Sequence, residues 1–206
     1  MSFEAFKTIL DKILASGHSP LGQIAFGADA QAESNPDLWK MMEYTRSRGL
    51  VPNITVAEIS DEVAQKLSQY CGAVAVSYYN FNTLLQSITL LQIANAKNNK
   101  KMQINIHAMI AEETFDKTME LLKLRAEESS LALNAINAIV LLSLKQKGRG
   151  KSLTPLSQDK FKQLVDYAQE HKVPIGFDSC SAFKFLNAVK DHPNYNTLTN
   201  GSKKLL

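Results

Sequence analysis

The sequence has few cysteines and no long hydrophobic run. Its two cysteines, Cys71 and Cys180, lie far apart among 206 residues, so the chain lacks the dense disulfide framework of small secreted domains. No apolar stretch reaches the length of about 20 residues that spans a bilayer. The first residues also lack the basic start and the small-residue cleavage site of a secretory signal. We therefore expect a cytoplasmic protein with no membrane segment.

The charge of the chain is nearly balanced. There are 23 Lys and Arg residues against 20 Asp and Glu residues, and the formal net charge is +3. That excess is too small to predict nucleic-acid binding by the chain as a whole. The 45% of hydrophobic residues is typical of a globular protein. The length suits one sizeable core, and we expect one domain over residues 1–190 and a polar, loosely ordered tail over 191–206.

Short apolar segments alternate with helical patterns along the chain. A helix over Phe3–Ala15 comes first, and six strand–helix units follow it. The predicted strands are Gln23–Gly27, Asn53–Val56, Ala73–Ser77, Gln103–Ile110, Ala135–Leu144 and Pro174–Phe177. Strands joined by helices predict a parallel sheet covered by helices. In such α/β folds, functional residues lie in the loops after the carboxyl ends of the strands.

The loop after the first strand carries polar side chains. Gly27 is followed by Asp29 and Gln31, whose side chains suit hydrogen bonds to an amine or a ribose. The loop does not have the GxGxxG pattern of a dinucleotide site. A polar connecting loop is the alternative interpretation.

A polar pair lies on the fourth strand. Asn105 and His107 share one face, because side chains alternate along a strand. His107 would serve as an acid, a base or a hydrogen-bond donor, or it is a core histidine with its hydrogen bonds satisfied.

A basic segment follows the fifth strand. Lys145, Lys147, Arg149 and Lys151 surround two glycines in "LKQKGRGK". Cations on a glycine-rich backbone suit a phosphate, a carboxylate or a nucleic-acid backbone. The spacing is not that of a P-loop, and a solvated basic loop is the alternative.

Cys180 follows the last strand in "IGFDSCSAFKF". It is a candidate nucleophile or metal ligand, or merely a small residue at a strand end. No histidine or second cysteine is its neighbour in sequence. A hydrolase or transferase built on His107, Asp178 and Cys180 is a third, weaker interpretation.

The order of these motifs resembles the radical SAM superfamily. The resemblance runs from "QIAFGADAQAESNP" through "INIHAMI" and "AIVLLSLKQKGRG" to "IGFDSCSAFKFLNAV", nearly the whole chain. It implies a partial (βα) TIM-like barrel that binds S-adenosylmethionine beside a 4Fe-4S cluster. It also implies cofactor contacts from Gly27, Asp29, Gln31, Ser77, His107 and Ser143. Cys180 would then lie near an auxiliary cluster as a metal ligand.

The chain departs from that superfamily in ways that bear on its activity. It has no CxxxCxxC motif, the first cluster-bearing strand is missing, and "GADA" replaces the usual GGEP. A cubane cluster takes three or four thiolates, so we expect no bound cofactor. Without the first strand, Gln23–Gly27 becomes an exposed sheet edge that invites a protein partner or a second copy.

Two functions follow from the resemblance and its departures. The first is a non-catalytic radical SAM-like scaffold that acts as a binding or inhibitory protein. It would be encoded by a phage or mobile element and directed at a host defence nuclease, as anti-CRISPR proteins are. The alternative is a radical SAM enzyme fragment that binds S-adenosylmethionine while a missing segment supplies the 4Fe-4S cluster. In either case the basic segment would add contacts to a protein partner or to nucleic acid.

Overall fold

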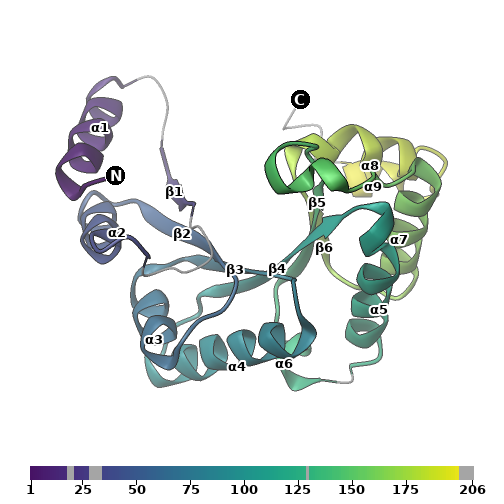
Figure 1. The fold of residues 1–206 in the computed structure, drawn as a ribbon, viewed down its shortest axis with the longest axis horizontal. Coiled ribbons are helices and arrows are strands. Elements are labelled where there is room, and N and C mark those ends of the chain that lie inside the picture. The colour runs from purple at the N-terminus through teal and green to yellow at the C-terminus, as the bar shows by residue number, and fades with distance from the viewer. Residues whose placement is uncertain (18–20, 28–33, 129, 200–206) are drawn as a thin grey trace. The chain divides into compact units, whose positions relative to one another are not determined.

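The computed structural model describes residues 1–17, 21–27, 34–128 and 130–199. It is an α/β protein with a six-stranded parallel sheet in the order β1-β2-β3-β4-β5-β6, flanked by helices (Figure 1). This confirms the predicted fold class. Closure into a barrel stays a prediction.

The helices and strands alternate as the sequence predicts. The strands are β1 (Gln23–Phe26), β2 (Val51–Val56), β3 (Ala73–Ser77), β4 (Gln103–Ile110), β5 (Ala138–Ser143) and β6 (Ile175–Phe177). The helices are α1 (Phe3–Ala15), α2 (Leu38–Ser47), α3 (Asp61–Tyr70), α4 (Phe81–Lys97), α5 (Phe115–Ala126), α6 (Leu131–Asn134), α7 (Gln158–Glu170), α8 (Ala182–Val189) and α9 (Tyr195–Thr199). No helix of the described residues is both long and apolar enough to cross a membrane.

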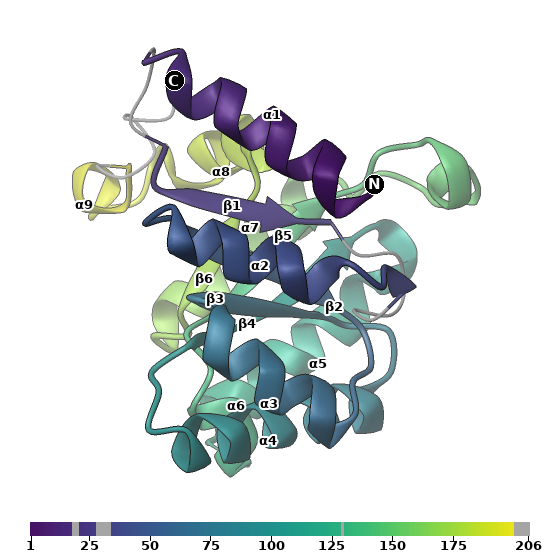
Figure 2. The same cartoon turned by 90° about the vertical axis from the view of Figure 1, so that its left-hand side faces the viewer.

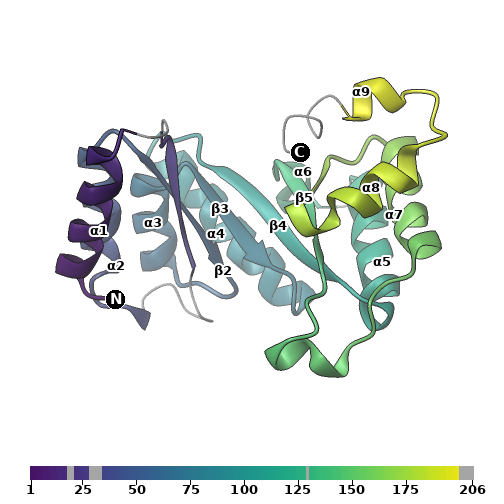
Figure 3. The same cartoon turned by 90° about the horizontal axis from the view of Figure 1, so that it is seen from above.

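The chain forms two compact units, Met1–Asn105 and Ile106–Leu206. In the first unit, β2 pairs in parallel with β1 and β3, with Ile54 opposite Phe26 and Val74. Helices α2, α3 and α4 pack against these strands (Figure 3). The buried residues between them include Met42, Leu67 and Ile88, and they form the apolar core of this unit.

Local capping explains where several helices begin. The Ser2 hydroxyl accepts a hydrogen bond from the Ala5 N–H at 3.3 Å, and the Ser60 hydroxyl accepts one from the Val63 N–H at the same distance. Each bond satisfies an N–H group that has no partner within the helix. The predicted start of α1 at Phe3 is therefore confirmed.

The second unit contains β5 and β6, which pair in parallel with Leu141 opposite Phe177. Helices α5, α7 and α8 supply buried Leu121, Phe161 and Phe185. The Phe177 and Phe185 rings stack with centroids 4.3 Å apart, so this contact fixes α8 against the end of β6.

Several predicted elements differ in their limits. Strand β2 begins at Val51 rather than at the predicted Asn53, and the strand predicted over Ala135–Leu144 begins only at Ala138, because the preceding residues form α6 and a turn. Helix α2 begins at Leu38, after a turn in which the Asn35 side chain accepts a hydrogen bond from the Asp37 N–H. The segment predicted as a loose tail contains α9, in which Thr199 is buried.

Candidate functional site

Three polar residues meet at the carboxyl ends of two strands in the second unit. Ser143 ends β5, Asp178 directly follows β6, and Ser181 lies in the 3₁₀ turn Ser179–Ser181 before α8. The Ser143 and Ser181 hydroxyl oxygens are 2.7 Å apart. We call these three residues the strand-end cluster.

Asp178 organises the strand-end cluster. Its Oδ1 accepts hydrogen bonds from the Ser181 hydroxyl at 2.6 Å and from the Ser181 N–H at 3.0 Å. The Ser143 N–H also approaches this oxygen, at 3.4 Å. A carboxylate after a strand and before a helical turn is a natural N-cap. The cap therefore fixes the cluster, and Ser143 is half-buried at its margin.

His107 is electrostatically coupled to this cluster. It is half-buried on β4, and burial lowers the pKa of its imidazole, while the Asp178 carboxylate partly opposes that shift. A neutral imidazole offers one donor and one acceptor. Two of the residues for which the radical SAM resemblance implies cofactor contacts, His107 and Ser143, thus both interact with Asp178.

The other predicted cofactor residues lie in the first unit or outside the described residues. Gly27 is exposed just after β1, and Ser77 ends β3 half-buried. Asp29 and Gln31 lie outside the described residues.

The two cysteines do not fit a 4Fe-4S cluster. Cys71 is buried in the first unit, where burial raises the pKa of its thiol to about 12 and its Sγ lies 3.9 Å from the Met42 Sδ. Cys180 is exposed in the second unit. A search of the described residues finds no group of three or more His, Cys, Asp or Glu side chains that could hold a metal ion. The chain itself therefore does not supply the thiolates that a cubane cluster takes.

The predicted basic segment forms a short 3₁₀ helix, Gly148–Ser152. Lys145, Lys147 and Lys151 are exposed there, while the Arg149 side chain is outside the described residues. A Cβ atom on Gly150 would lie 2.5 Å from the Lys145 carbonyl oxygen, so this close turn requires glycine. The three described lysines are available to an anionic partner.

Two glutamates hold the chain just after the basic segment. Glu112 accepts a hydrogen bond from the Ser157 N–H at 2.8 Å and pairs with the Lys160 ammonium at 2.6 Å. Glu113 accepts from the Thr154 N–H at 3.0 Å. These bonds lower the pKa of both carboxyl groups. We call Glu112 and Glu113 the glutamate clamp.

In the first unit, β1 ends the strand order and pairs with β2 alone among the described strands. The Val51 N–H donates to the Gly22 carbonyl at 3.1 Å. Backbone groups alternate sides along a strand, so the N–H groups of Gln23 and Ala25 point away from β2. Within the described residues, β1 therefore presents an edge whose outward N–H groups pair with no strand.

Helix α1 lies beside this edge (Figure 2), and its apolar stripe is only partly covered. Phe6, Ile9, Leu10 and Ile13 share that stripe, because they stand at the i, i+3, i+4 and i+7 positions of a helix. Phe6 contacts Phe26 of β1 with ring centroids 5.6 Å apart, and Leu10 is buried. Ile9 and Ile13, one helical turn apart, stay 47% and 50% exposed. We call the β1 edge with Ile9 and Ile13 the α1–β1 surface.

Sequence reasoning identified the β1 edge but not the exposure of Ile9 and Ile13 or the role of Ser181. The spacing of Phe6, Ile9, Leu10 and Ile13 marks one apolar stripe, yet it does not tell how much of that stripe the rest of the fold covers. The Asp-x-x-Ser pattern in "DSCS" was the available signal for a capping turn.

The sequence matches no protein-family model and no curated protein among those searched. The radical SAM resemblance therefore rests on the order of the motifs alone.

Proposed function

We propose that this chain is a non-catalytic protein-binding scaffold of the radical SAM-like type, and that the α1–β1 surface is where it binds. The observation that carries the proposal is the coincidence of an open strand edge with an exposed isoleucine pair. Unpaired strand edges recruit further strands. An apolar patch beside the edge adds a hydrophobic contribution of about 25 cal/mol per Å² buried.

A second copy of the chain is the occupant that the surface fits first. A two-fold interface brings the same patch of both subunits together, so the patch must be complementary to itself. Ile9 and Ile13 carry no charge, and an apolar stripe meets this requirement. The β1 edge of a second copy also offers the backbone N–H and C=O groups with which a strand edge pairs.

The test is sedimentation velocity of the full chain over a range of concentrations. We expect the wild type to associate and Ile13→Lys to weaken the association at least about tenfold, because a lysine at the interface must be desolvated. Ile93→Lys is the matched control, since Ile93 is 51% exposed on α4 and lies outside the α1–β1 surface.

Three results of sedimentation, combined with binding measurements on candidate protein partners, would decide between the possibilities. Association that both variants lose equally would contradict a role for this surface. A monomeric wild type that binds a host nuclease through Ile13 would support the scaffold and overturn the second copy as its occupant. If the wild type is monomeric, and the Ile13→Lys variant binds every tested protein as tightly as the wild type does, the proposal is overturned.

The strand-end cluster favours a second candidate, a site for the nucleoside part of S-adenosylmethionine. A serine hydroxyl and a neutral imidazole near one carboxylate suit the hydroxyl groups and ring nitrogens of a nucleoside. Calorimetric titration of S-adenosylmethionine would test this candidate, with Ser143→Ala expected to weaken binding several-fold. Ser152→Ala, in the exposed basic segment, is the control. No heat of binding with the wild type would remove this candidate.

A further inference from the structure

The first unit contains a cationic pocket at the amino-terminal ends of β3 and β4, away from the strand ends where the sequence predicts function. Its volume is about 410 Å³, within the range of small-molecule sites. The pocket is lined by Arg46, Ser68, Gln69, Cys71, Gly72, Lys100, Lys101 and Met102. Three of these side chains are cations and none is an acid.

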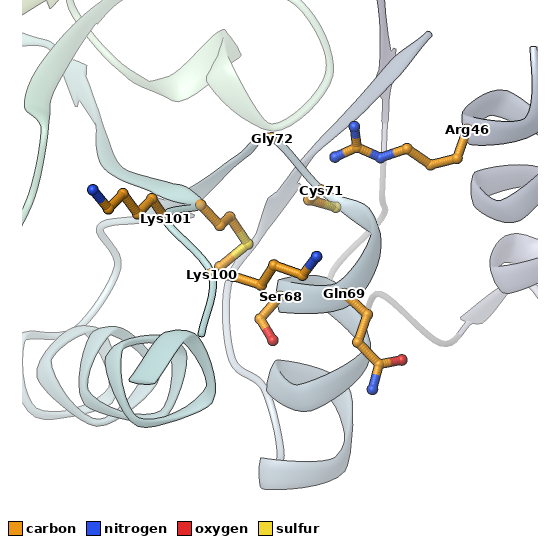
Figure 4. Close-up of a pocket in the computed structure, with 8 residues that line it drawn as sticks. Arg46, Ser68, Gln69, Cys71, Gly72, Lys100 and Lys101 are labelled. Atoms are coloured by element: carbon orange, nitrogen blue, oxygen red, sulfur yellow. The ribbon is translucent and has the colours of Figure 1, made fainter. Parts of the chain in front are cut away.

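Two of the cations converge on the pocket. Figure 4 shows the Arg46 guanidinium and the Lys100 ammonium directed from opposite sides toward the space beside Cys71, whereas Lys101 extends the other way. Among the described residues, neither Arg46 nor Lys100 forms an ion pair. No carboxylate of the described residues therefore neutralises their charge.

Arg46 is held in place by the fold. It lies in the last turn of α2, and its Nε donates to the carbonyl oxygen of Tyr70, the last residue of α3. That bond satisfies one of the free carbonyl groups at the end of α3. The other guanidinium N–H groups remain for a ligand, and their planar arrangement matches two oxygens of one anion.

The rest of the lining makes this a site for a group larger than a simple ion. Cys71 and Met102 are buried and give the pocket an apolar side. The Cys71 thiol is protonated at neutral pH, since burial raises its pKa to about 12. It therefore adds no negative charge to repel an anion.

We propose that this pocket binds a dianionic phosphate group between Arg46 and Lys100. Two cations on opposite sides suit a group with two negative charges better than a carboxylate with one. The phosphate would be inorganic phosphate or the head of a small phosphate ester whose organic part lies against Met102. The site is independent of the α1–β1 surface and goes beyond the function proposed above.

The experiment is a titration of the full chain with inorganic phosphate and, separately, with glycerol 3-phosphate. Chloride keeps the ionic strength constant, and the amide chemical shifts of Gly72 and Met102 report binding. We expect saturable shifts with the wild type. Lys100→Glu should weaken binding at least about tenfold, because one charge-assisted contact is lost and a repulsion is added.

Two further variants keep the test decisive. Lys97→Glu changes the same charge in the last turn of α4, where Lys97 is exposed and outside the pocket lining, so it should bind as the wild type does. Lys100→Met removes the charge without adding a repulsion and should also weaken binding. Tighter binding of the ester would identify the source as a phosphate ester, and tighter binding of inorganic phosphate would identify the free ion. Shifts that do not saturate, or that Lys97→Glu and Lys100→Glu reduce equally, would overturn the proposal.

Discussion

At the scale of single residues, Asp178 joins several groups of the second unit. It caps the turn before α8, holds the two serines of the strand-end cluster, and opposes the lowering of the His107 pKa. One carboxylate thus links the end of β6 to the imidazole on β4. Its substitution should therefore be detected at His107.

Asp178→Asn should lower the pKa of His107 below its value in the wild type. The change removes a negative charge that favours the protonated imidazole, while the burial that disfavours it stays. NMR titration of the His107 ring protons measures this shift. Asp166→Asn is the control, because Asp166 pairs with Lys162 on the exposed side of α7. An unchanged or raised His107 pKa would contradict the coupling.

The same histidine predicts how stability depends on pH. Its folded pKa is lowered from the ordinary value of 6.5, so the unfolded chain binds a proton first as the pH falls. The contribution of His107 is complete well above pH 6.5 and is lost as the pH falls through that value toward the folded pKa. His107→Gln should flatten this part of the curve of unfolding free energy against pH, measured with urea.

Gly72 is a residue whose identity is set by packing. A Cβ atom there would lie 2.3 Å from the Val51 Cγ1, which no side-chain contact tolerates. Gly72→Ala should reduce the free energy of unfolding by about 1–3 kcal/mol. Gly22→Ala, where a Cβ would meet open space, should change it much less. Equal urea midpoints for the two variants would contradict the close approach of β2 and β3.

At the scale of elements, capping residues and side-chain alternation predicted where helices and strands begin and end better than long apolar runs did. The limits of α1, α3, β3 and β4 follow from caps and from side-chain periodicity, which act within a few residues. The run "AINAIVLLSL" is apolar throughout, so its periodicity does not tell where the turn after α6 ends and β5 begins. The cationic pocket was not predictable, because it joins Arg46 to Lys100 through the ends of different helices.

The glutamate clamp gives the basic segment a pH-dependent anchor. The hydrogen bond from the Lys160 ammonium, followed by that from Ser157, lowers the pKa of Glu112, and hydrogen bonds accepted from backbone N–H groups lower that of Glu113. Their stabilising effect is present above the ordinary carboxyl pKa of 4.5 and is lost as the pH falls through their lowered values.

Glu112→Gln should speed hydrogen exchange of the Ser157 amide at neutral pH, because the charged acceptor of that N–H is replaced by a neutral one. Glu113→Gln should act in the same way on Thr154. Glu120→Gln, on the exposed side of α5, is the control. If the Ser157 amide exchanges as fast in the wild type as in Glu112→Gln, the clamp does not hold in solution.

At the scale of the whole molecule, the chain combines an α/β fold with a strand edge, that of β1, which no other described strand pairs with. The proposed function depends on that edge being used by a partner. The N–H of Ala25 points away from β2, whereas that of Ile24 points toward it, as the bond from Val51 to Gly22 indicates. The two neighbouring amides therefore report on the two sides of the same strand.

Hydrogen–deuterium exchange of these two amides, measured by NMR at low and high protein concentration, is the most direct test of the central claim. We predict that the Ile24 amide is protected at both concentrations, whereas the Ala25 amide becomes protected only when the chain associates. Ala25→Pro removes the outward N–H at a position where an edge strand tolerates proline, and it should weaken the association. An Ala25 amide that exchanges freely in the associated protein would contradict docking at the β1 edge.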